Sequence, residues 1–398
     1  MFRHSFAPGA LALALCAAPN AFGATDAELA DIRNEIRALK ESYEARIQAL
    51  ERRLKEAEAA PAPAPMPVPA APSGSDSNAS AFNPTISAIL TGTYAHLPRE
   101  GGSVRRGFGL GESEVVLSAN VAPSFAGTLI LSVSPENTID VEEAYGQWLT
   151  APFGLSPKFG RFLSGLGYLN EQHAHAWDFV DPPLAYDRFL GGQYAQDGVQ
   201  VKWIAPIDHY VELGGEVGNG SGFPGSDRGG NGVGSSAFYA HAGGDIGDAA
   251  SWRAGLSYLR TKSEDDLGAT ASSSLGIADF VWKYAPGGSN REGAAKVQGE
   301  YFRGTVRDVT SQSGWYLQGV YQFLPEWRAG ARYDRVDAVP LSDTDYTRRA
   351  SAMLDFNPSE FTRIRLQYSR AELLSGTYDN QWFVQYILSL GAHGAHKY

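Results

Sequence analysis

From Phe82 to Tyr398 the sequence repeats short stretches in which apolar and polar residues alternate with a period of two. In the stretch TRIRLQYSR, Ile364 and Leu366 alternate with Arg363 and Arg365. This is the period of a β-strand, whose successive side chains point to opposite faces. We count about sixteen such stretches of roughly ten residues, which is typical of an antiparallel transmembrane barrel. The last of them, Gln381–Leu390, is expected to pair with the first, near Thr85–Tyr94.

The composition favours a membrane barrel over a soluble sandwich. The chain has 45 Gly, 12% aromatic and only 19% charged residues, which suits aromatic belts and tight turns. No run of about 18 apolar residues follows the N-terminal segment, so no transmembrane helix is expected. A sandwich would bury the apolar faces, whereas a barrel turns them toward lipid and keeps polar faces inside. Outer-membrane lipid is therefore an expected partner.

The connections alternate between short turns and longer loops, as in outer-membrane barrels. Short turns are expected at Ala122-Pro123, Ala151-Pro152, Pro206-Ile207, Asp248-Ala249, Pro325-Glu326 and Asn357-Pro358, and a longer one near Pro286. The loops between them vary in length, and those near Glu136 and Asp308 are short. This arrangement puts both ends of the barrel on the periplasmic side and the loops outside.

Three segments precede the barrel. Residues 1–23 have the polar start, short apolar core and small terminal residues of a secretory signal, and they contain Cys16, the one cysteine. Residues 24–59 carry an apolar seam from Leu29 to Leu54 with gaps of three and four, which predicts a coiled coil. Residues 60–81 form a linker, first Pro/Ala-rich and then Ser-rich. An amphipathic helix docked on the barrel is the alternative to the coiled coil.

Signal, coiled coil, Pro-rich linker and barrel together resemble the coiled-coil-bearing porins of Gram-negative bacteria. The stretches PKFGRFLSGLGYLNEQ and DRFLGGQYAQDGVQVKW are similar to phosphate-selective (O/P-type) porins, in which a Gly-Arg-Phe strand end leads into a constriction loop. The matching residues are Gly160, Arg161 and Phe162, then Arg188, Gly191 and Gly192. The resemblance implies a passive outer-membrane pore, self-association as a homotrimer and a periplasmic N-terminal region. The barrel lacks the Lys-rich character expected for phosphate selectivity.

Ser164–Ala195 is the longest loop and the expected constriction of the pore. The candidate residues on it and on the strand before it are Arg161, Glu171, Asp178, Asp181, Asp187 and Arg188. Strand phase places further arginines inward on three consecutive strands: Arg328, Arg332, Arg349, Arg363 and Arg365. A basic wall facing an acidic loop would produce a transverse field that biases ion passage. The alternative is a set of salt bridges that stiffen the barrel, with carboxylates such as Asp334 and Asp355 between the arginines.

Other functions have weaker signals. His173 and His175 are weak metal candidates, as are His393 and His396, because two imidazoles lack a clear third ligand. The Gly-rich loop Gly218–Gly234 lacks the residues of a P-loop, and no G-x-S-x-G motif occurs, so neither an enzyme nor a cofactor is expected. The net charge of −11 argues against nucleic acid. A porin is the main interpretation; a zinc-uptake channel and a structural tether to peptidoglycan through the coiled coil are the alternatives.

Overall fold

The computed structural model describes residues 84–99, 104–133, 138–226, 232–265, 267–288, 293–337 and 345–391. The predicted signal, coiled coil and linker, and the C-terminal histidines, lie outside these residues. The strands are β1 (Thr85–His96), β2 (Gly107–Leu110), β3 (Ser113–Ala122), β4 (Phe125–Val133), β5 (Ile139–Trp148), β6 (Leu155–Leu163), β7 (Ala195–Ile204), β8 (Tyr210–Gly218), β9 (Ser235–Ile246), β10 (Ala250–Glu264), β11 (Thr270–Tyr284), β12 (Ala295–Val306), β13 (Val309–Leu324), β14 (Trp327–Asp337), β15 (Tyr346–Ser359), β16 (Thr362–Leu373) and β17 (Tyr378–Gly391). The described helices are η1 (Pro152–Gly154), η2 (Ala174–Ala176), α2 (Leu184–Leu190) and η3 (Pro286–Gly288).

The strands form a closed antiparallel barrel, and the predicted number of sixteen is confirmed. Strands β2 and β3 both pair with β1, along its second and first halves respectively, so they are two parts of one interrupted strand. The interruption lies at Gly111, whose amide donates to the carbonyl of Thr91. A Cβ at Gly111 would lie 2.5 Å from Thr91 Cγ2, so the close approach requires glycine here.

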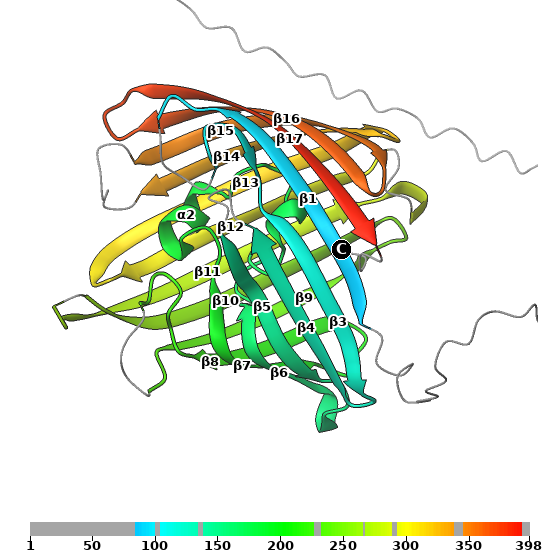
Figure 1. Ribbon diagram of the computed structural model, residues 1–398, viewed down its shortest axis with the longest axis vertical. Coiled ribbons are helices and arrows are strands. Elements are labelled where there is room, and N and C mark those ends of the chain that lie inside the picture. The colour runs from blue at the N-terminus through cyan, green and yellow to red at the C-terminus, as the bar shows by residue number, and fades with distance from the viewer. Residues whose placement is uncertain are drawn as a thin grey trace, which may run out of the picture. The chain divides into compact units, whose positions relative to one another are not determined.

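The first and last strands close the barrel as predicted. Strand β1 pairs antiparallel with β17, with Leu90 opposite Leu388, and the two strands lie side by side in Figure 1. Both chain ends of the barrel are therefore at the end that carries the short turns. One turn is displaced from its predicted place: β15 continues through Asn357-Pro358 to Ser359, and the register shift there accommodates Pro358, which has no N–H to donate.

The two faces of the wall differ in polarity as the alternation predicts. On β16, Leu366 is 45% exposed while its neighbour Arg365 is 1% exposed. On β17, Trp382, Val384 and Tyr386 are exposed and alternate with the buried Phe383 and Gln385. The exposed row is apolar and suits lipid, whereas the opposite row points into the barrel. Among the described residues, no helix is long and apolar enough to cross a membrane.

Candidate functional site: the loop between β6 and β7

Residues 164–194 connect β6 to β7 and pack against the inner face of the barrel wall. Helix α2, which belongs to this loop, contacts β12, β13, β14 and β15 and lies within the ring of strands in Figure 1. Residues of strands that lie far from the loop in sequence therefore hold it inside the barrel. Four parts of the loop make contacts with the wall: a neck, an apolar helix, a charged segment and a pair of histidines.

The neck of the loop is fixed by two buried carboxylates of the wall. Ser164 Oγ and the amide of Gly165 donate to Glu216 on β8, at 2.6 and 2.9 Å. The amides of Tyr168 and Leu169 donate to Glu300 on β12. Backbone N–H groups that would otherwise be buried without an acceptor are satisfied in this way. Each of these two side chains binds two donors of the neck, so the pair fixes four donor groups of the loop.

Asn170 closes the neck. Its side-chain amide donates to the carbonyls of Ser164 and Tyr194 at 2.8 and 2.9 Å, and its Oδ1 accepts the amide of Tyr194 at 2.8 Å. These three bonds hold the two ends of the loop together. One side chain therefore fixes where the loop leaves and re-enters the wall.

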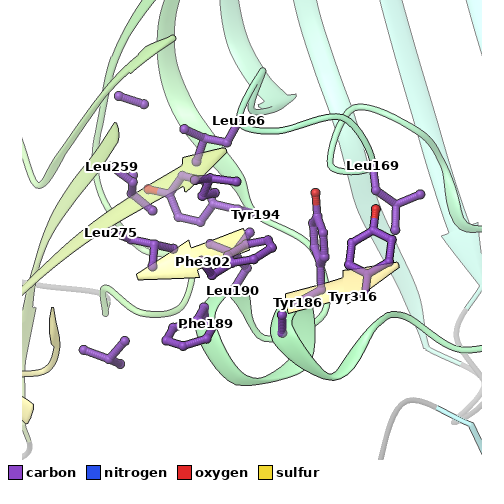
Figure 2. Packing of buried hydrophobic residues seen from close by; sticks show 14 of the residues in the cluster. Leu166, Leu169, Tyr186, Phe189, Leu190, Tyr194, Leu259, Leu275, Phe302 and Tyr316 are labelled. Carbon is purple, nitrogen blue, oxygen red and sulfur yellow. The ribbon is translucent and has the colours of Figure 1, made fainter. Parts of the chain in front are cut away.

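Helix α2 is docked by apolar packing. Phe189 is fully buried and stacks on Phe302 of β12 with ring centroids 5.8 Å apart. Figure 2 shows Phe189 and Leu190 beside Phe302, and Tyr186 beside Tyr316. The inner faces of β9 to β12 supply further apolar residues to this cluster: Ala237, Leu259, Leu275, Ile277 and Val306. The inner face of the wall is therefore apolar at these residues, and the helix binds there.

Two details fit α2 to this surface. The helix ends at Gly191, whose φ of 67° is a left-handed conformation that favours glycine. On β13, a Cβ at Gly314 would lie 2.9 Å from Phe189 Cε2. Glycine at this position lets the helix approach the wall closely. Phe223 from the Gly-rich β8–β9 loop packs on the same cluster, so this loop contributes to the site.

The charged segment of the loop binds the predicted arginine wall. Asp181 accepts from Arg332 at 2.8 Å and pairs with Arg349 at 2.6 Å. Asp178 pairs with Arg328 at 3.0 Å and with Lys296. Between the arginines lie the expected carboxylates. Asp334 contacts Arg332 and Arg349, and Asp355 contacts Arg328, Arg363 and Arg365.

Carbonyl groups of the loop also accept from these arginines. Arg365 donates to Trp177 at 2.9 Å, Arg349 to Pro182 at 2.5 Å, and Arg332 to Asp181 at 2.8 Å. A planar guanidinium can satisfy a carboxylate and a carbonyl at once because it has five donors. The wall therefore recognises both the side chains and the backbone of the loop.

The loop acids and the wall arginines are in direct contact rather than facing each other across water. The contacts of Asp178 and Asp181 favour the salt-bridge alternative over a transverse field at these two residues. A different acidic surface lies elsewhere on the wall, where Glu114, Glu143, Glu212 and Glu216 of β3, β5 and β8 are all buried. The sequence does not indicate this surface, because its members lie on three strands that are far apart in the chain.

Acid is expected to loosen the loop through Asp178. Burial alone would raise the pKa of its carboxyl, but Lys296 and Arg328 hold the pKa well below its ordinary value. The stabilisation is then complete above the unfolded pKa of about 3.9 and is lost as the pH falls toward the folded pKa. Guanidinium unfolding midpoints at about pH 6 and about pH 3 should differ more for the wild type than for Asp178→Asn. If the midpoint changes by the same amount between the two pH values in the wild type and in Asp178→Asn, Asp178 does not have this role.

The other predicted residues lie outside the arginine network. Arg161 is 41% exposed and pairs at 2.6 Å with Asp197, on the outer face of β6 and β7 rather than on the pore wall. The alternation explains its place, because the exposed Phe159 precedes it by two residues. Glu171 pairs with Lys202 of β7. Arg188 donates to Gln312, while Asp187 is exposed on α2.

His173 and His175, the two metal candidates of the loop, lie together with stacked rings 5.8 Å apart. Their surroundings were not predicted. His173 contacts Glu142 and Glu143 of β5, and His175 Nδ1 lies 2.6 Å from Glu114 of β3. Burial disfavours a charged ring, but hydrogen bonds with Glu142 and Glu143 raise the pKa of His173 well above its usual value. This histidine–glutamate cluster joins the loop to β3 and β5.

Comparison with known proteins identifies the fold and one relative. No family model matches the chain. Three similar solved structures are a loop-deletion mutant of the Vibrio cholerae outer membrane protein OmpT (14% identity, TM-score 0.54), Pseudomonas putida OprB (13%, 0.54) and an anion-selective porin from Comamonas acidovorans (12%, 0.53). Each match covers 78% of this chain and 99%, 95% and 100%, respectively, of the other chain. At these identities the likeness establishes the fold.

One relative is similar in sequence as well. An uncharacterized protein of Aquifex aeolicus (strain VF5) is 31% identical in an alignment 340 residues long, and the match covers 74% of this chain and 71% of that protein. A match of this extent is not confined to one strand or loop. The chain therefore belongs to the same family as this Aquifex aeolicus protein, and its described residues form a barrel of the outer-membrane porin fold.

Proposed function

We propose that the protein is an outer-membrane porin that lets small hydrophilic solutes or ions diffuse through a lumen narrowed by the loop 164–194. The observation that carries this proposal is the loop itself, which is bound along its length to the inner face of a barrel with an apolar exterior. The porin fold of the similar structures supports it. Wall-bound loops of this kind reduce a wide barrel to a passage whose polar lining selects solutes.

The lining beside the loop is basic. Several cations on the inner face are only partly buried and lie next to the loop: Lys202, Arg253, Lys283, Lys296, Arg328 and Arg363. Arg253 and Lys283 approach the ring of Tyr168 to 5.4 and 5.7 Å. Fixed positive charge at a constriction favours anions. We therefore expect chloride to pass more readily than potassium, and the anion-selective porin among the similar structures supports this expectation.

Conductance of the purified protein in a planar bilayer tests this function. A porin gives discrete, ohmic current steps in potassium chloride. The second candidate is an anchor with a closed barrel, and it is favoured by the number of strands that contact the loop. These include β3, β5, β7, β8, β10 and β12 to β16. Absence of current from correctly folded protein would reject the porin and leave the anchor.

Arg363 and Arg332 should differ in their effect on selectivity. The side chain of Arg363 is 25% exposed, whereas that of Arg332 is 1% exposed and lies between Asp181 and Asp334. A buried charge that is paired with carboxylates contributes little to the electric field that a passing ion experiences. Arg363→Ala should therefore shift the reversal potential in a potassium chloride gradient toward cations, and Arg332→Ala should shift it less. Equal shifts, or none, would contradict this assignment.

The proposal also covers the part of the chain before the barrel. Residues 24–59 would form a periplasmic coiled coil that joins three chains, and in the anchor function this coiled coil would contact peptidoglycan. One of the similar solved structures is described as the trimer form of OmpT. Cross-linking of the full-length protein and of a variant lacking residues 24–59 tests whether this segment holds the oligomer together.

A further inference from the structure

The histidine–glutamate cluster brings an imidazole and two carboxylates to one point. His173 Nδ1 lies 2.9 Å from Glu142 Oε1 and 3.6 Å from Glu114 Oε2. One ligand atom from each of the three residues lies within 4.8 Å of the others. Zn²⁺ in proteins binds nitrogen and oxygen at about 2.0–2.2 Å, so its tetrahedral ligands are about 3.3 Å apart. The two separations from His173 Nδ1 are close to this value.

Carboxyl groups outnumber imidazoles in the cluster by four to two. Glu142 and Glu143 of β5 and Glu114 of β3 converge on two imidazoles, and Glu112 is near enough to interact with Glu114 and Glu142. The side chain of Glu142 is only 9% exposed, and its buried Oε2 has no hydrogen-bond partner among the described residues. Leaving a buried carboxylate oxygen without a partner is costly.

The other ring nitrogen of His173 has the partner that a metal ligand requires. His173 Nε2 lies 3.3 Å from Glu143 Oε2. Metal-binding histidines usually donate their second ring N–H to a carboxylate, which fixes the tautomer and the orientation of the ring. His175 Nδ1, at 2.6 Å from Glu114 Oε1, holds the second carboxylate in the same manner. The cluster thus has both an inner set of ligands and an outer set of supports.

We propose that this cluster is a binding site for a divalent transition metal such as Zn²⁺, with His173 Nδ1, Glu142 and Glu114 as ligands and Glu143 as the acceptor for His173 Nε2–H. A water completes the coordination, as in other three-ligand zinc sites. Mixed imidazole and carboxylate ligands suit Zn²⁺ better than Ca²⁺ or Mg²⁺, which prefer oxygen alone. The metal would tie the loop to β3 and β5, next to the arginine wall, since Arg363 donates to the carbonyl of His175.

A second buried histidine provides a matched contrast. His241 on β9 lies 3.1 Å from Glu212 on β8 and is fully buried. Within the described part of the chain, the only group of three or more possible metal ligands is that of Glu114, Glu142 and His173. His241 therefore resembles His173 in burial and in its carboxylate partner, but not in the number of converging ligands.

Calorimetric titration with ZnCl₂ of the full-length protein, folded in detergent and treated with a chelator, tests the site. The tail histidines His393 and His396 are replaced by Ala in every sample so that they do not bind the added metal. We expect one Zn²⁺ per chain. Glu142→Gln should weaken binding at least tenfold, and Glu143→Gln about 10–100-fold because an outer-shell partner is lost. His241→Asn should leave binding unchanged.

X-ray absorption of the zinc-loaded wild type gives a result that does not depend on how the variants fold. The proposal predicts one imidazole and oxygen ligands at about 2.0–2.2 Å. No saturable binding, a spectrum without imidazole, or affinity unchanged in folded Glu142→Gln would overturn it. The inference is independent of the porin proposal, since a barrel that carries no current can still bind the metal, and a conducting one can lack it.

Discussion

Asp181→Ala should lower the free energy of unfolding by about 3–5 kcal/mol, the cost of removing one partner from a buried ion pair. Asp181 Oδ1 accepts from Arg332 and Gln367, both at 2.8 Å, and Oδ2 pairs with Arg349 at 2.6 Å. Alanine leaves two buried guanidinium groups sharing the carboxylate of Asp334. Equilibrium unfolding in guanidinium chloride of protein folded in lipid vesicles measures the loss.

Two controls distinguish the effect of losing a buried ion pair from the effect of losing a charge. Asp197→Ala breaks the pair with Arg161, in which both side chains are 41% exposed, and should cost less than about 1 kcal/mol. A double-mutant cycle of Asp181→Ala with Arg349→Ala should give a coupling energy of about 0.5–3 kcal/mol. If the two Asp→Ala variants lose equal stability, the wall does not hold the loop through Asp181.

Phe189→Ala should be similarly destabilising, by about 3–5 kcal/mol. The Phe189 ring is fully buried between α2 and β12, where it stacks on Phe302, and it lies close to Gly314 on β13. Removing it leaves a cavity in the apolar cluster, since the barrel wall is too rigid to collapse onto the helix. The loss should be concentrated in α2, so hydrogen exchange of residues 184–190 should accelerate markedly.

Phe280→Ala is the matched control because this ring is 46% exposed on the outer face of β11. In lipid it should leave exchange in α2 unchanged, whatever its effect on insertion. In the bilayer, Phe189→Ala should also make the current noisier, because a loosened helix changes the width of the passage. Unchanged exchange in residues 184–190 would show that apolar packing does not hold α2.

The strands were predictable because the residues of each strand alternate between polar and apolar, according to whether they face the lumen or the lipid. On β16, Arg365 and Leu366 are adjacent in sequence, yet one is buried and the other is nearly half exposed. Lipid and lumen impose this alternation at every strand, so short-range sequence pattern is sufficient. The interrupted strand β2–β3 and the displaced turn after Ser359 are departures at Gly111 and Pro358, where backbone chemistry overrides the pattern.

The site was predictable only in part. Strand phase correctly placed Arg332, Arg349 and Arg365 on the inner face, and the loop was identified by its length. The residues that bind the loop's neck, Glu216 and Glu300, gave no local signal, since a single glutamate on a strand does not indicate what it will face. Arg161, assigned by motif resemblance alone, lies on the outer face.

The sequence by itself determined a closed barrel of sixteen strands, its polar and apolar faces, and a long loop with acidic residues opposite basic strands. Only the tertiary structure decided that the loop touches the arginine wall, that α2 docks through Phe189, and that His173 meets Glu114 and Glu142. The physical reason is range: alternation is set by neighbouring residues, whereas these contacts join segments that the closed barrel alone brings together.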